Sequence, residues 1–415
     1  MKLPLNQWLT NWQRYVDAEL LTVVILLLGF GLVVMTSASV AKADQMVGDP
    51  YYFLTRQMAF IMIAVIAGII VYRVRLNLWS GVGVWLLPIV VLLLVIVLIP
   101  NIGVKVNGSR RWIRLGVANV QVSELAKLII FMYIASYMDR HGKKLRTLES
   151  YKPLLIPLAV LSVFGVLLLA EPDFGTVVVI FSTGLAMLYL GGVKLARLSV
   201  VLVFTIISMG LFLMLGGYRM NRMVSYMNPW ADSTDAGYQV TNALMAIGDG
   251  GWLGSGLGGS VQKQLYLPEA HNDFIFAILA DEFGFIGICI TLVLFGWLIY
   301  RVFIIGLKAD KKRQYFNAYL AYTIGFWIGF QSIFHIGVNL ALLPPKGLTL
   351  PFMSYGGSSI VTTLLAVSLL MRVHYETQLS PTEYKKLTEK SIRGTGKQIT
   401  RKIQRNNGRK RKSNV

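Results

Sequence analysis

Long apolar runs separated by short polar segments make up most of the chain between residues 19 and 374. A helix needs about 20 mostly apolar residues to cross a membrane, and ten runs approach that length. The pattern therefore predicts an all-α polytopic membrane protein with ten transmembrane helices. These helices are expected at residues 19–41, 56–72, 78–100, 121–138, 153–170, 175–191, 197–216, 272–300, 316–342 and 355–373.

The composition supports a membrane protein and excludes several other classes. Of the 415 residues, 55% are hydrophobic and 14% are charged, whereas a soluble domain carries about 25% charged residues. One soluble core cannot bury so much apolar surface. The single cysteine, Cys289, excludes a disulfide scaffold. The first apolar stretch, Leu20 to Val40, is longer than the apolar region of a cleavable signal peptide, so it is predicted to remain as a span.

The positive charge is unevenly distributed along the chain. The net charge of +20 comes from 40 Lys and Arg against 20 Asp and Glu. Basic residues concentrate in cytoplasmic loops, and most of them fall on one side if residues 1–18 form a cytoplasmic N-terminal segment. Both termini are therefore predicted to be cytoplasmic. The membrane domain covers 19–374, and a basic tail covers 375–415.

The basic tail has two interpretations. Its polar composition is typical of a solvated, disordered segment that helps to fix the topology. Alternatively, it contacts anionic lipid headgroups, at about 1 kcal/mol per basic residue near the surface. Nucleic-acid binding is disfavoured, because the tail lacks interleaved aromatic residues and a recognisable reading module.

Two predicted extracytoplasmic segments depart from the general pattern. The loop 101–120 carries four basic residues on the side that usually lacks them. The loop 217–271, between helices seven and eight, is long for a connection without function. Its aromatic residues predict a folded, docked loop, namely Trp230, Tyr238, Trp252 and Tyr266.

Few ionisable residues lie in or at the ends of the spans, and such residues are usually functional. Glu124 and Lys127 share a helix face and can pair, either as a structural ion pair or as part of a polar site. Asp273 opens the eighth span, where it is either a helix N-cap or a base at the outer membrane edge. Asp173, beside Pro172, is better explained as a turn residue.

The arginines of the loop 101–120 are candidates for binding an anionic, lipid-linked substrate. The planar guanidinium of Arg110, Arg111 or Arg114 matches phosphate oxygens. The alternative is that these side chains simply extend to the level of the headgroups.

The motif search leaves other chemistries without support. No HExxH zinc motif, phosphate-binding GxxxxGK[ST] loop or GxSxG nucleophile elbow occurs in the sequence, and the four His residues are scattered. No metal site is predicted from ligand spacing. The glycine-rich run Gly254–Gly259 follows no predicted strand, so it predicts a flexible turn and not a dinucleotide site.

Five segments resemble the signatures of the SEDS family (shape, elongation, division and sporulation) of membrane proteins. They are YLPEAHNDFIFA at 266–277, PPKGLTLPFMSYGGSS at 344–359, GSRRWI at 108–113, SELAK at 123–127 and EPDFGT at 171–176. They occur in the family's order, and the family's ten-span architecture agrees with the hydrophobic pattern. SVQK at 260–263 and PKG at 345–347 are similar to the septal, cell-division branch more than to the elongation branch. The departures are small: Asn272, Val122 and Pro345 stand where Thr, Pro and Thr are frequent.

The resemblance implies a peptidoglycan glycosyltransferase that polymerises lipid II, a disaccharide-pentapeptide on undecaprenyl pyrophosphate, at the outer face of the membrane. Asp273 matches the family's essential acidic residue, which reverses the preference for an N-cap. The implied substrate-binding candidates are Arg110, Arg111, Glu124, Lys127, His271, Lys346 and Ser358.

The expected mechanism is an inverting glycosyl transfer in which Asp273 acts as general base on the acceptor 4-hydroxyl. General-base assistance contributes roughly 10²–10⁴-fold. Arginines or a divalent cation, Mg²⁺ or Mn²⁺, would stabilise the pyrophosphate, although no ligand cluster is visible. The alternatives are a lipid II flippase, an elongation-type polymerase and a scaffold for division proteins.

The resemblance also implies partners and a location. A class B penicillin-binding protein would crosslink the glycan, and other divisome proteins would regulate the septal enzyme. The expected location is the bacterial cytoplasmic (inner) membrane at the division septum.

Overall fold

The computed structural model of the chain describes residues 14–106, 109–116, 118–147, 152–200, 203, 210, 228–233, 237–344 and 346–384. Most of the predicted segment 197–216 and the tail from residue 385 lie outside the described residues, as do 217–227 and 234–236 of the large loop. The helix predicted at 197–216, the predicted fold of these parts of the large loop and the predicted disordered tail therefore remain predictions.

Long helices form most of the described structure. Six of them are long and apolar enough to cross a membrane, and α7 is a shorter apolar helix. The chain is thus a multi-pass helical membrane protein. The elements are α2 (Ala18–Val47), α3 (Tyr52–Arg73), α4 (Leu76–Leu98), β1 (Gly103–Val106), β2 (Ser109–Leu115), β3 (Ala118–Gln121), α5 (Val122–Thr147), α6 (Lys152–Ala170), α7 (Phe174–Leu190), η1 (Pro229–Asp232), α10 (Tyr238–Asp249), α11 (Ile275–Lys311), α12 (Tyr315–Asn339) and α13 (Gly357–Gln378).

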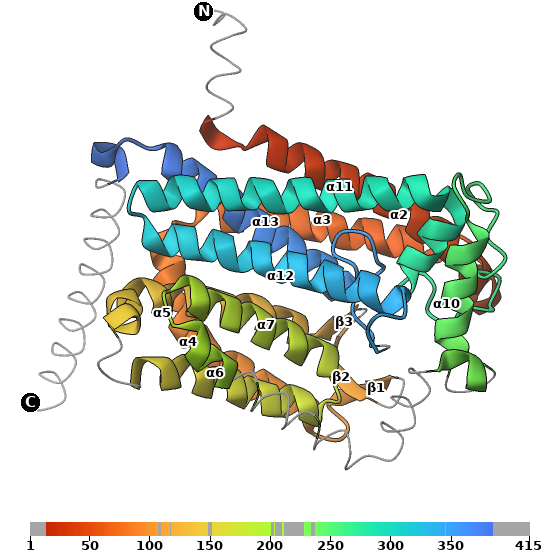
Figure 1. Cartoon of the computed structure of the whole chain (residues 1–415), viewed down its shortest axis with the longest axis horizontal. Coiled ribbons are helices and arrows are strands. Elements are labelled where there is room, and N and C mark those ends of the chain that lie inside the picture. The colour runs from red at the N-terminus through yellow and green to blue at the C-terminus, as the bar shows by residue number, and fades with distance from the viewer. Residues whose placement is uncertain are drawn as a thin grey trace, which may run out of the picture.

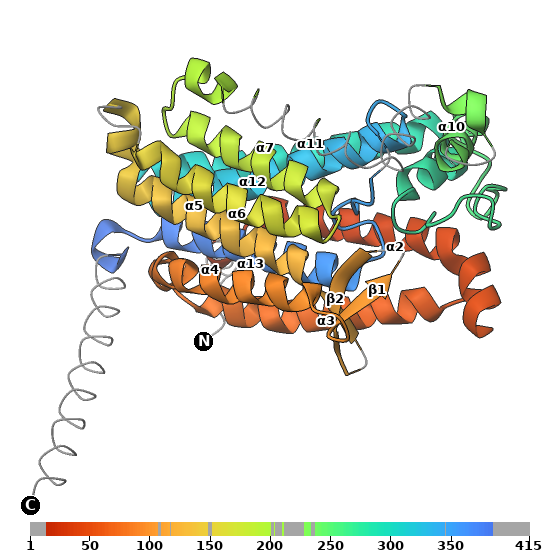
Figure 2. The ribbon, with the colours of Figure 1, turned by 90° about the horizontal axis from the view of Figure 1, so that it is seen from below.

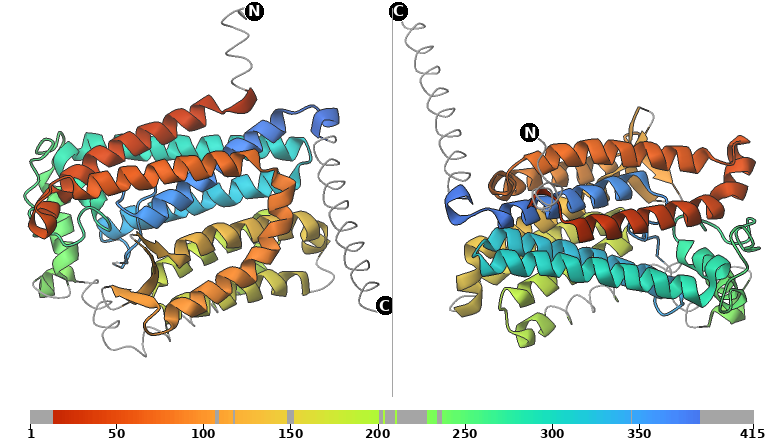
Figure 3. Two further views of the ribbon diagram at one scale, coloured as in Figure 1. Left: turned by 180° about the vertical axis from the view of Figure 1, so that it is seen from behind. Right: turned by 90° about the horizontal axis from the view of Figure 1, so that it is seen from above.

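The helices run roughly parallel to the long axis of the molecule in two groups (Figure 1). The first group packs α11 against α2 and α12, and α3 against α13 (Figure 3). The second group packs α4, α5, α6 and α7 together, and α12 joins it through α5 and α7. The outward side of α3 is apolar and exposed at Met62, Ile66 and Ile70, as expected for a helix surface that faces lipid.

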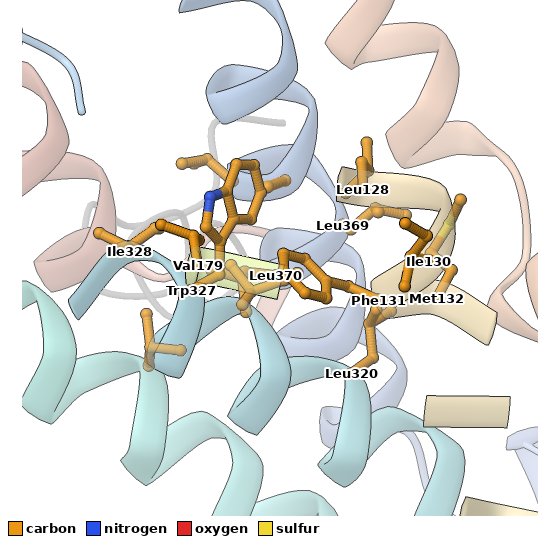
Figure 4. Packing of buried hydrophobic residues seen from close by; sticks show 14 of the residues in the cluster. Leu128, Ile130, Phe131, Met132, Val179, Leu320, Trp327, Ile328, Leu369 and Leu370 are labelled. Carbon is orange, nitrogen blue, oxygen red and sulfur yellow. The ribbon is translucent and has the colours of Figure 1, made fainter. Parts of the chain in front are cut away.

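The hydrophobic core runs through most of the described helices, and Figure 4 shows the part where α5, α7, α12 and α13 meet. Phe131 of α5 and Trp327 of α12 are almost fully buried, with ring centroids 5.5 Å apart. Leu369 and Leu370 of α13 lie beside them. This packing holds the four helices together.

The segment expected as a loop at 101–120 is a three-stranded antiparallel sheet with the order β1-β2-β3. It lies at one end of the bundle, the end that also carries α10 (Figure 2). Side chains alternate between the two faces of a strand. Ile113 packs on the core, so Arg111 lies on the same inner face while Arg110 lies on the opposite face.

Both ends of the described chain lie at the opposite end of the bundle. Arg14 pairs with Glu383 at 2.7 Å, and the rings of Tyr15 and Tyr375 stack with centroids 5.4 Å apart. This arrangement agrees with the prediction that both termini are on one side of the membrane.

Helix α11 is interrupted at Gly284, whose φ of 62° and ψ of −160° are not helical. At the break, backbone groups of α11 hydrogen-bond to the preceding glycine-rich loop instead of to the helix. Ser255 N donates to Asp281 O at 2.8 Å, and Phe285 N donates to Gly251 O at 2.9 Å. The run Gly254–Gly259 is therefore docked on α11 and is not the flexible turn that the sequence predicted. Ser255 Oγ also donates to Asp281, and the largely exposed ring of Trp252 lies edge-on to Phe285 of α11 with centroids 5.2 Å apart.

Candidate active site

A tight turn before α11 presents Asp273. The carbonyl of Glu269 accepts hydrogen bonds from the backbone nitrogens of Asn272 at 3.0 Å and Asp273 at 2.9 Å. The helix N-cap is Phe274, without a side-chain cap bond. Asp273 therefore does not cap this helix, which removes the N-cap alternative that its position before the span had left open. Its carboxylate instead lies ahead of the helix, where it is available for chemistry.

The Asp273 carboxylate rests against a glycine from a distant segment. A Cβ atom added at Gly347 would lie 2.9 Å from Oδ2 of Asp273. Asn339 Nδ2 donates to the Asp273 carbonyl at 3.1 Å, and Asn339 Oδ1 accepts from Ala277 N at 3.1 Å. Among the described residues, no hydrogen bond or ion pair engages the Asp273 carboxylate. The backbone is fixed while the partly exposed carboxylate keeps free lone pairs.

The surroundings of Asp273 favour its protonated form. Burial and the negative Glu269 raise the pKa of Asp273 to about 7, although the positive charges of Arg111 and Lys42 oppose the rise. A carboxyl with a pKa near neutrality is suited to take up a proton from a substrate hydroxyl. The site therefore combines an unpaired base with nearby positive charge.

His271 belongs to the turn that carries Asp273, and aromatic side chains hold its ring. Its ring packs between Phe53 and Tyr355, with centroids at 4.5 Å and 5.7 Å, and is almost fully buried. Burial and the positive Lys42 lower the pKa of His271 to about 4, so the ring is neutral at pH 7. His271 also accepts at its carbonyl from Tyr355 N at 3.0 Å. His271, which the sequence predicted to bind substrate, is therefore packed between two aromatic rings and helps to hold the turn in place.

The segment 346–358 contacts this turn through Ser354 and Tyr355, whereas the two predicted residues of the segment, Lys346 and Ser358, have their described contacts elsewhere. Ser354 Oγ donates to the Asn272 carbonyl at 2.7 Å. Lys346 lies over the ring of Phe174, with Nζ 5.0 Å from its centroid. Ser358 Oγ accepts from Gln121 N at 2.8 Å, which ties the end of β3 to the start of α13.

Arg111 is held by the turn between α6 and α7. Its Nε donates to the Glu171 carbonyl at 3.2 Å, Nη2 donates to the Pro172 carbonyl, and Nη1 lies 3.7 Å from Oδ1 of Asp173. Asp173 also caps α7 by accepting from Thr176 N and Oγ1. Arg111 is therefore held in place by the turn while its charge acts on Asp273, and Asp173 is more than the turn residue that its position beside a proline predicted.

Arg110 lies on the other face of β2. It is the cross-strand neighbour of Lys105, and Arg114 is exposed. Among the described residues, no carboxylate pairs with Lys105, Arg110 or Arg114. The basic group that the sequence treated as one set is divided between an inward Arg111 and outward neighbours.

Glu171 is a buried carboxyl that sequence reasoning left without a role. Both of its carboxylate oxygens lack hydrogen-bond partners among the described residues. Burial and the adjacent Asp173 raise the pKa of Glu171 to about 8. The group is therefore mostly protonated at pH 7 and does not compete with Asp173 for Arg111.

The predicted pairing of Glu124 with Lys127 is confirmed, with Lys127 Nζ 3.0 Å from Glu124 Oε1. The pair lies inside the bundle, where Lys127 Nζ also donates to Gln331 Oε1 at 2.9 Å. Gln331 Nε2 donates to the Thr349 carbonyl at 2.8 Å, two residues after Gly347. The pair therefore reaches the Asp273 site through Gln331 and the segment 346–349.

No protein-held metal ion is indicated in the part of the chain that the structure describes. It contains no group of three or more His, Cys, Asp or Glu side chains suited to a metal. The described residues around Asp273 therefore offer no all-protein site for the expected divalent cation, which would be held mainly by the substrate pyrophosphate, and no catalytic step is assigned to one.

These elements match a known family of membrane proteins. A family model described as a cell cycle protein, FtsW/RodA/SpoVE, matches residues 18–379. The chain belongs to this family. The resemblance to the SEDS proteins is thereby confirmed.

Curated relatives and solved structures agree with this assignment. The "Probable peptidoglycan glycosyltransferase FtsW" of Thioalkalivibrio sulfidiphilus is 48% identical over 87% of this chain and 90% of its own length. The protein of the same name from Nitrosococcus halophilus is 46% identical over 87% and 93%. A chain from a structure entitled "Structural coordination of polymerization and crosslinking by a peptidoglycan synthase complex" aligns with a TM-score of 0.72 at 25% identity, over 87% of this chain and 98% of that chain. The rod shape determining protein RodA of Thermus thermophilus shares the fold, with a TM-score of 0.63 at 24% identity, over 88% and 98%.

Proposed function

We propose that the protein is a peptidoglycan glycosyltransferase that polymerises lipid II during septal cell wall synthesis. Family membership and relatives named FtsW at 42–48% identity support this proposal. The observation that carries it is the unpaired Asp273 carboxylate, beside the inward Arg111, at the end of the bundle away from both chain ends.

The proposed reaction is an inverting transfer. The Asp273 carboxylate takes the proton of the acceptor 4-hydroxyl, and that oxygen forms a bond to the anomeric carbon of the growing chain. The bond from this carbon to the pyrophosphate oxygen breaks, and undecaprenyl pyrophosphate leaves with the electron pair. An α-linked donor thus gives a β-linked product without a covalent enzyme intermediate, so one carboxylate suffices where glycosidases use two.

The other predicted residues have supporting roles in this proposal. Arg111, fixed by three consecutive residues of the α6–α7 turn, supplies positive charge without reorganisation. Arg110, Lys346 and Ser358 contact the substrate, and the Glu124–Lys127 pair supports the segment 346–349. A Mg²⁺ or Mn²⁺ ion that accompanies the pyrophosphate is part of the proposal but has no assigned protein ligands.

The proposal includes the protein's surroundings. The chain has ten spans with both termini in the cytoplasm, and it lies in the bacterial inner membrane at the division septum. Its partners are a class B penicillin-binding protein and other divisome proteins. The relationship to a chain from a synthase complex supports a crosslinking partner.

The test is glycan formation by purified protein and its transpeptidase partner from lipid II supplied in detergent, where no transport is needed. Wild-type protein should form long glycan, and Asp273→Asn should form almost none. A flippase is the alternative, favoured by the buried Glu124–Lys127 pair inside the bundle. It predicts no glycan from either protein but transport of lipid II across vesicles. Wild-type rate and product length from Asp273→Asn would refute the assignment of the base.

A further inference from the structure

The outer end of α2 extends to the turn that carries Asp273. Helix α2 has 30 residues, so it is about 45 Å long, whereas the hydrocarbon core of a bilayer is about 30 Å thick. Its last turns therefore emerge from the hydrocarbon. In these turns Lys42 Nζ lies 2.8 Å from Oε1 of Glu269, and the two side chains are 31% and 32% exposed.

Glu269 is the residue around which the turn is built. Its φ is 55°, a left-handed backbone conformation that is uncommon for a residue other than glycine. Its carbonyl accepts from the nitrogens of Asn272, Asp273 and Phe274. The ion pair with Lys42 therefore anchors, from a separate helix, the residue that orients the Asp273 backbone.

The charges that face Asp273 come from several elements. The turn supplies Glu269 and the neutral His271, α2 supplies Lys42, and β2 supplies Arg111. The segment after α12 carries Lys346 next to Gly347, with its Nζ over the ring of Phe174. Of these groups, Glu269 and Lys42 form a pair whose members act on the Asp273 carboxylate with opposite sign.

We propose that Lys42 and Glu269 are positioning residues for Asp273, which hold its turn in place and balance the charge beside its carboxylate. This inference rests on the proposed role of Asp273 as the base. The pair does not touch the substrate and does not take the proton. It sets the fraction of Asp273 that is ionised and ready at a given pH.

Removing either member of the pair has a predictable sign. Without Lys42, the uncompensated negative charge of Glu269 disfavours a second carboxylate, so the pKa of Asp273 rises. Without the Glu269 charge, Lys42 and Arg111 face Asp273 alone, so its pKa falls. A purely structural pair would lower the rate in both variants without opposite changes in pH dependence.

The experiment measures kcat/KM for lipid II polymerisation as a function of pH, with full-length protein and its transpeptidase partner. We expect Lys42→Met to move the acid limb of the profile upward by at least about 0.5 pH unit and Glu269→Gln to move it downward by a similar amount. The double variant should lie close to wild type. The pH at which kcat/KM falls to half of its maximum on the acid limb does not depend on the amount of folded protein. Partial loss of stability therefore does not obscure the result.

Two controls accompany these variants. Lys42→Arg keeps the charge and should restore the wild-type limb. Asp44→Asn removes an exposed charge from the same end of α2 and should leave the limb unchanged. Shifts in the same direction for Lys42→Met and Glu269→Gln, or no shift in either, would overturn the inference even if Asp273→Asn is inactive. Full activity of Asp273→Asn would instead overturn the proposed function.

Discussion

Two aspartates precede long helices of this protein and have opposite surroundings. Asp17, before α2, caps that helix through Leu20 N at 3.0 Å and accepts from Arg301 Nε and Nη2 at 2.9 and 2.8 Å. Its Oδ2 also lies 3.0 Å from Nδ1 of His374. Asp273, before α11, caps nothing, and its carboxylate has no partner among the described residues.

The difference shows in the protonation of the two groups. Burial alone would raise the pKa of Asp17, but hydrogen bonds from His374, Arg301 and the helix N-terminus outweigh it and lower the pKa well below its usual range. Burial raises the pKa of Asp273 to about 7. A fully paired carboxylate joins α2, α11 and α13 at the end of the bundle where both ends of the described chain lie, whereas an unpaired one is held ready for a proton. The role of an aspartate that precedes a helix therefore depends on the partners of its carboxylate and not on its position in the sequence.

The largest expected effect is on catalysis at Asp273. Asp273→Asn should reduce polymerisation by about 10²–10⁴-fold, while its thermal midpoint in detergent stays equal or rises by a few degrees. The rise is expected because the raised pKa of Asp273 means that its ionisation above pH 4 costs stability in the folded state. In wild-type protein, activity should increase with pH through about 7 as the base ionises. A large loss of stability in Asp273→Asn would contradict the comparison.

Asp17→Asn should have the opposite outcome. It leaves the Arg301 charge without its main partner, so we expect a loss of about 3–5 kcal/mol of stability, with near-normal activity per folded molecule. The lowered pKa of Asp17 means that its stabilising contribution is present above about pH 4 and disappears as the pH falls further. Thermal unfolding in detergent at several pH values measures both effects. Unchanged stability with lost polymerisation would assign Asp17 to the site instead.

Gly347→Ala tests how closely the carboxylate is positioned. The added Cβ would lie 2.9 Å from Oδ2 of Asp273, and a flexible carboxylate can move away at little cost in stability. Because displacement by about 1 Å can cost 10²-fold in rate, we expect a clear drop in kcat with a small change in thermal midpoint. Gly29→Ala, where the new Cβ meets nothing within 4 Å, is the matched control and should behave as wild type.

The smallest effect is expected at the outward arginine. Arg110→Ala removes a substrate contact made equally in the ground and transition states, so KM for lipid II should rise severalfold while kcat is unchanged. Stability should change by no more than about 0.5 kcal/mol. Steady-state kinetics at several lipid II concentrations measure the two constants separately. A fall in kcat of the size seen with Asp273→Asn would mean that Arg110 acts at the reacting atoms.

The sequence predicted the helices well and the sheet poorly. Nine of the ten expected segments coincide with long described helices, because runs of about 20 apolar residues have few alternatives in a membrane. The sheet at 103–121 was expected as a loop, since three strands of four to seven residues give a weak pattern. Only strand pairing shows that Arg110 and Arg111 lie on opposite faces.

The candidate site was predicted in part. The sequence singled out Asp273, and the pairing of Glu124 with Lys127 follows from their spacing on one helix. It could not connect Lys42 with Glu269, which are separated by 227 positions, or Gly347 with Asp273, which are separated by the two helices α11 and α12. Such contacts depend on how the helices pack.

The sequence by itself determined that the chain is a helical membrane protein, predicted which of its sides is rich in basic residues, and singled out Asp273 through the family resemblance. These properties are local, because hydrophobic length and charge placement act segment by segment. Only the tertiary structure decided that the Asp17 carboxylate contacts Arg301 and His374, while the Asp273 carboxylate has no partner among the described residues and lies against Gly347. Electrostatic partners come from other helices, so the chemistry of a carboxylate is fixed when those helices meet.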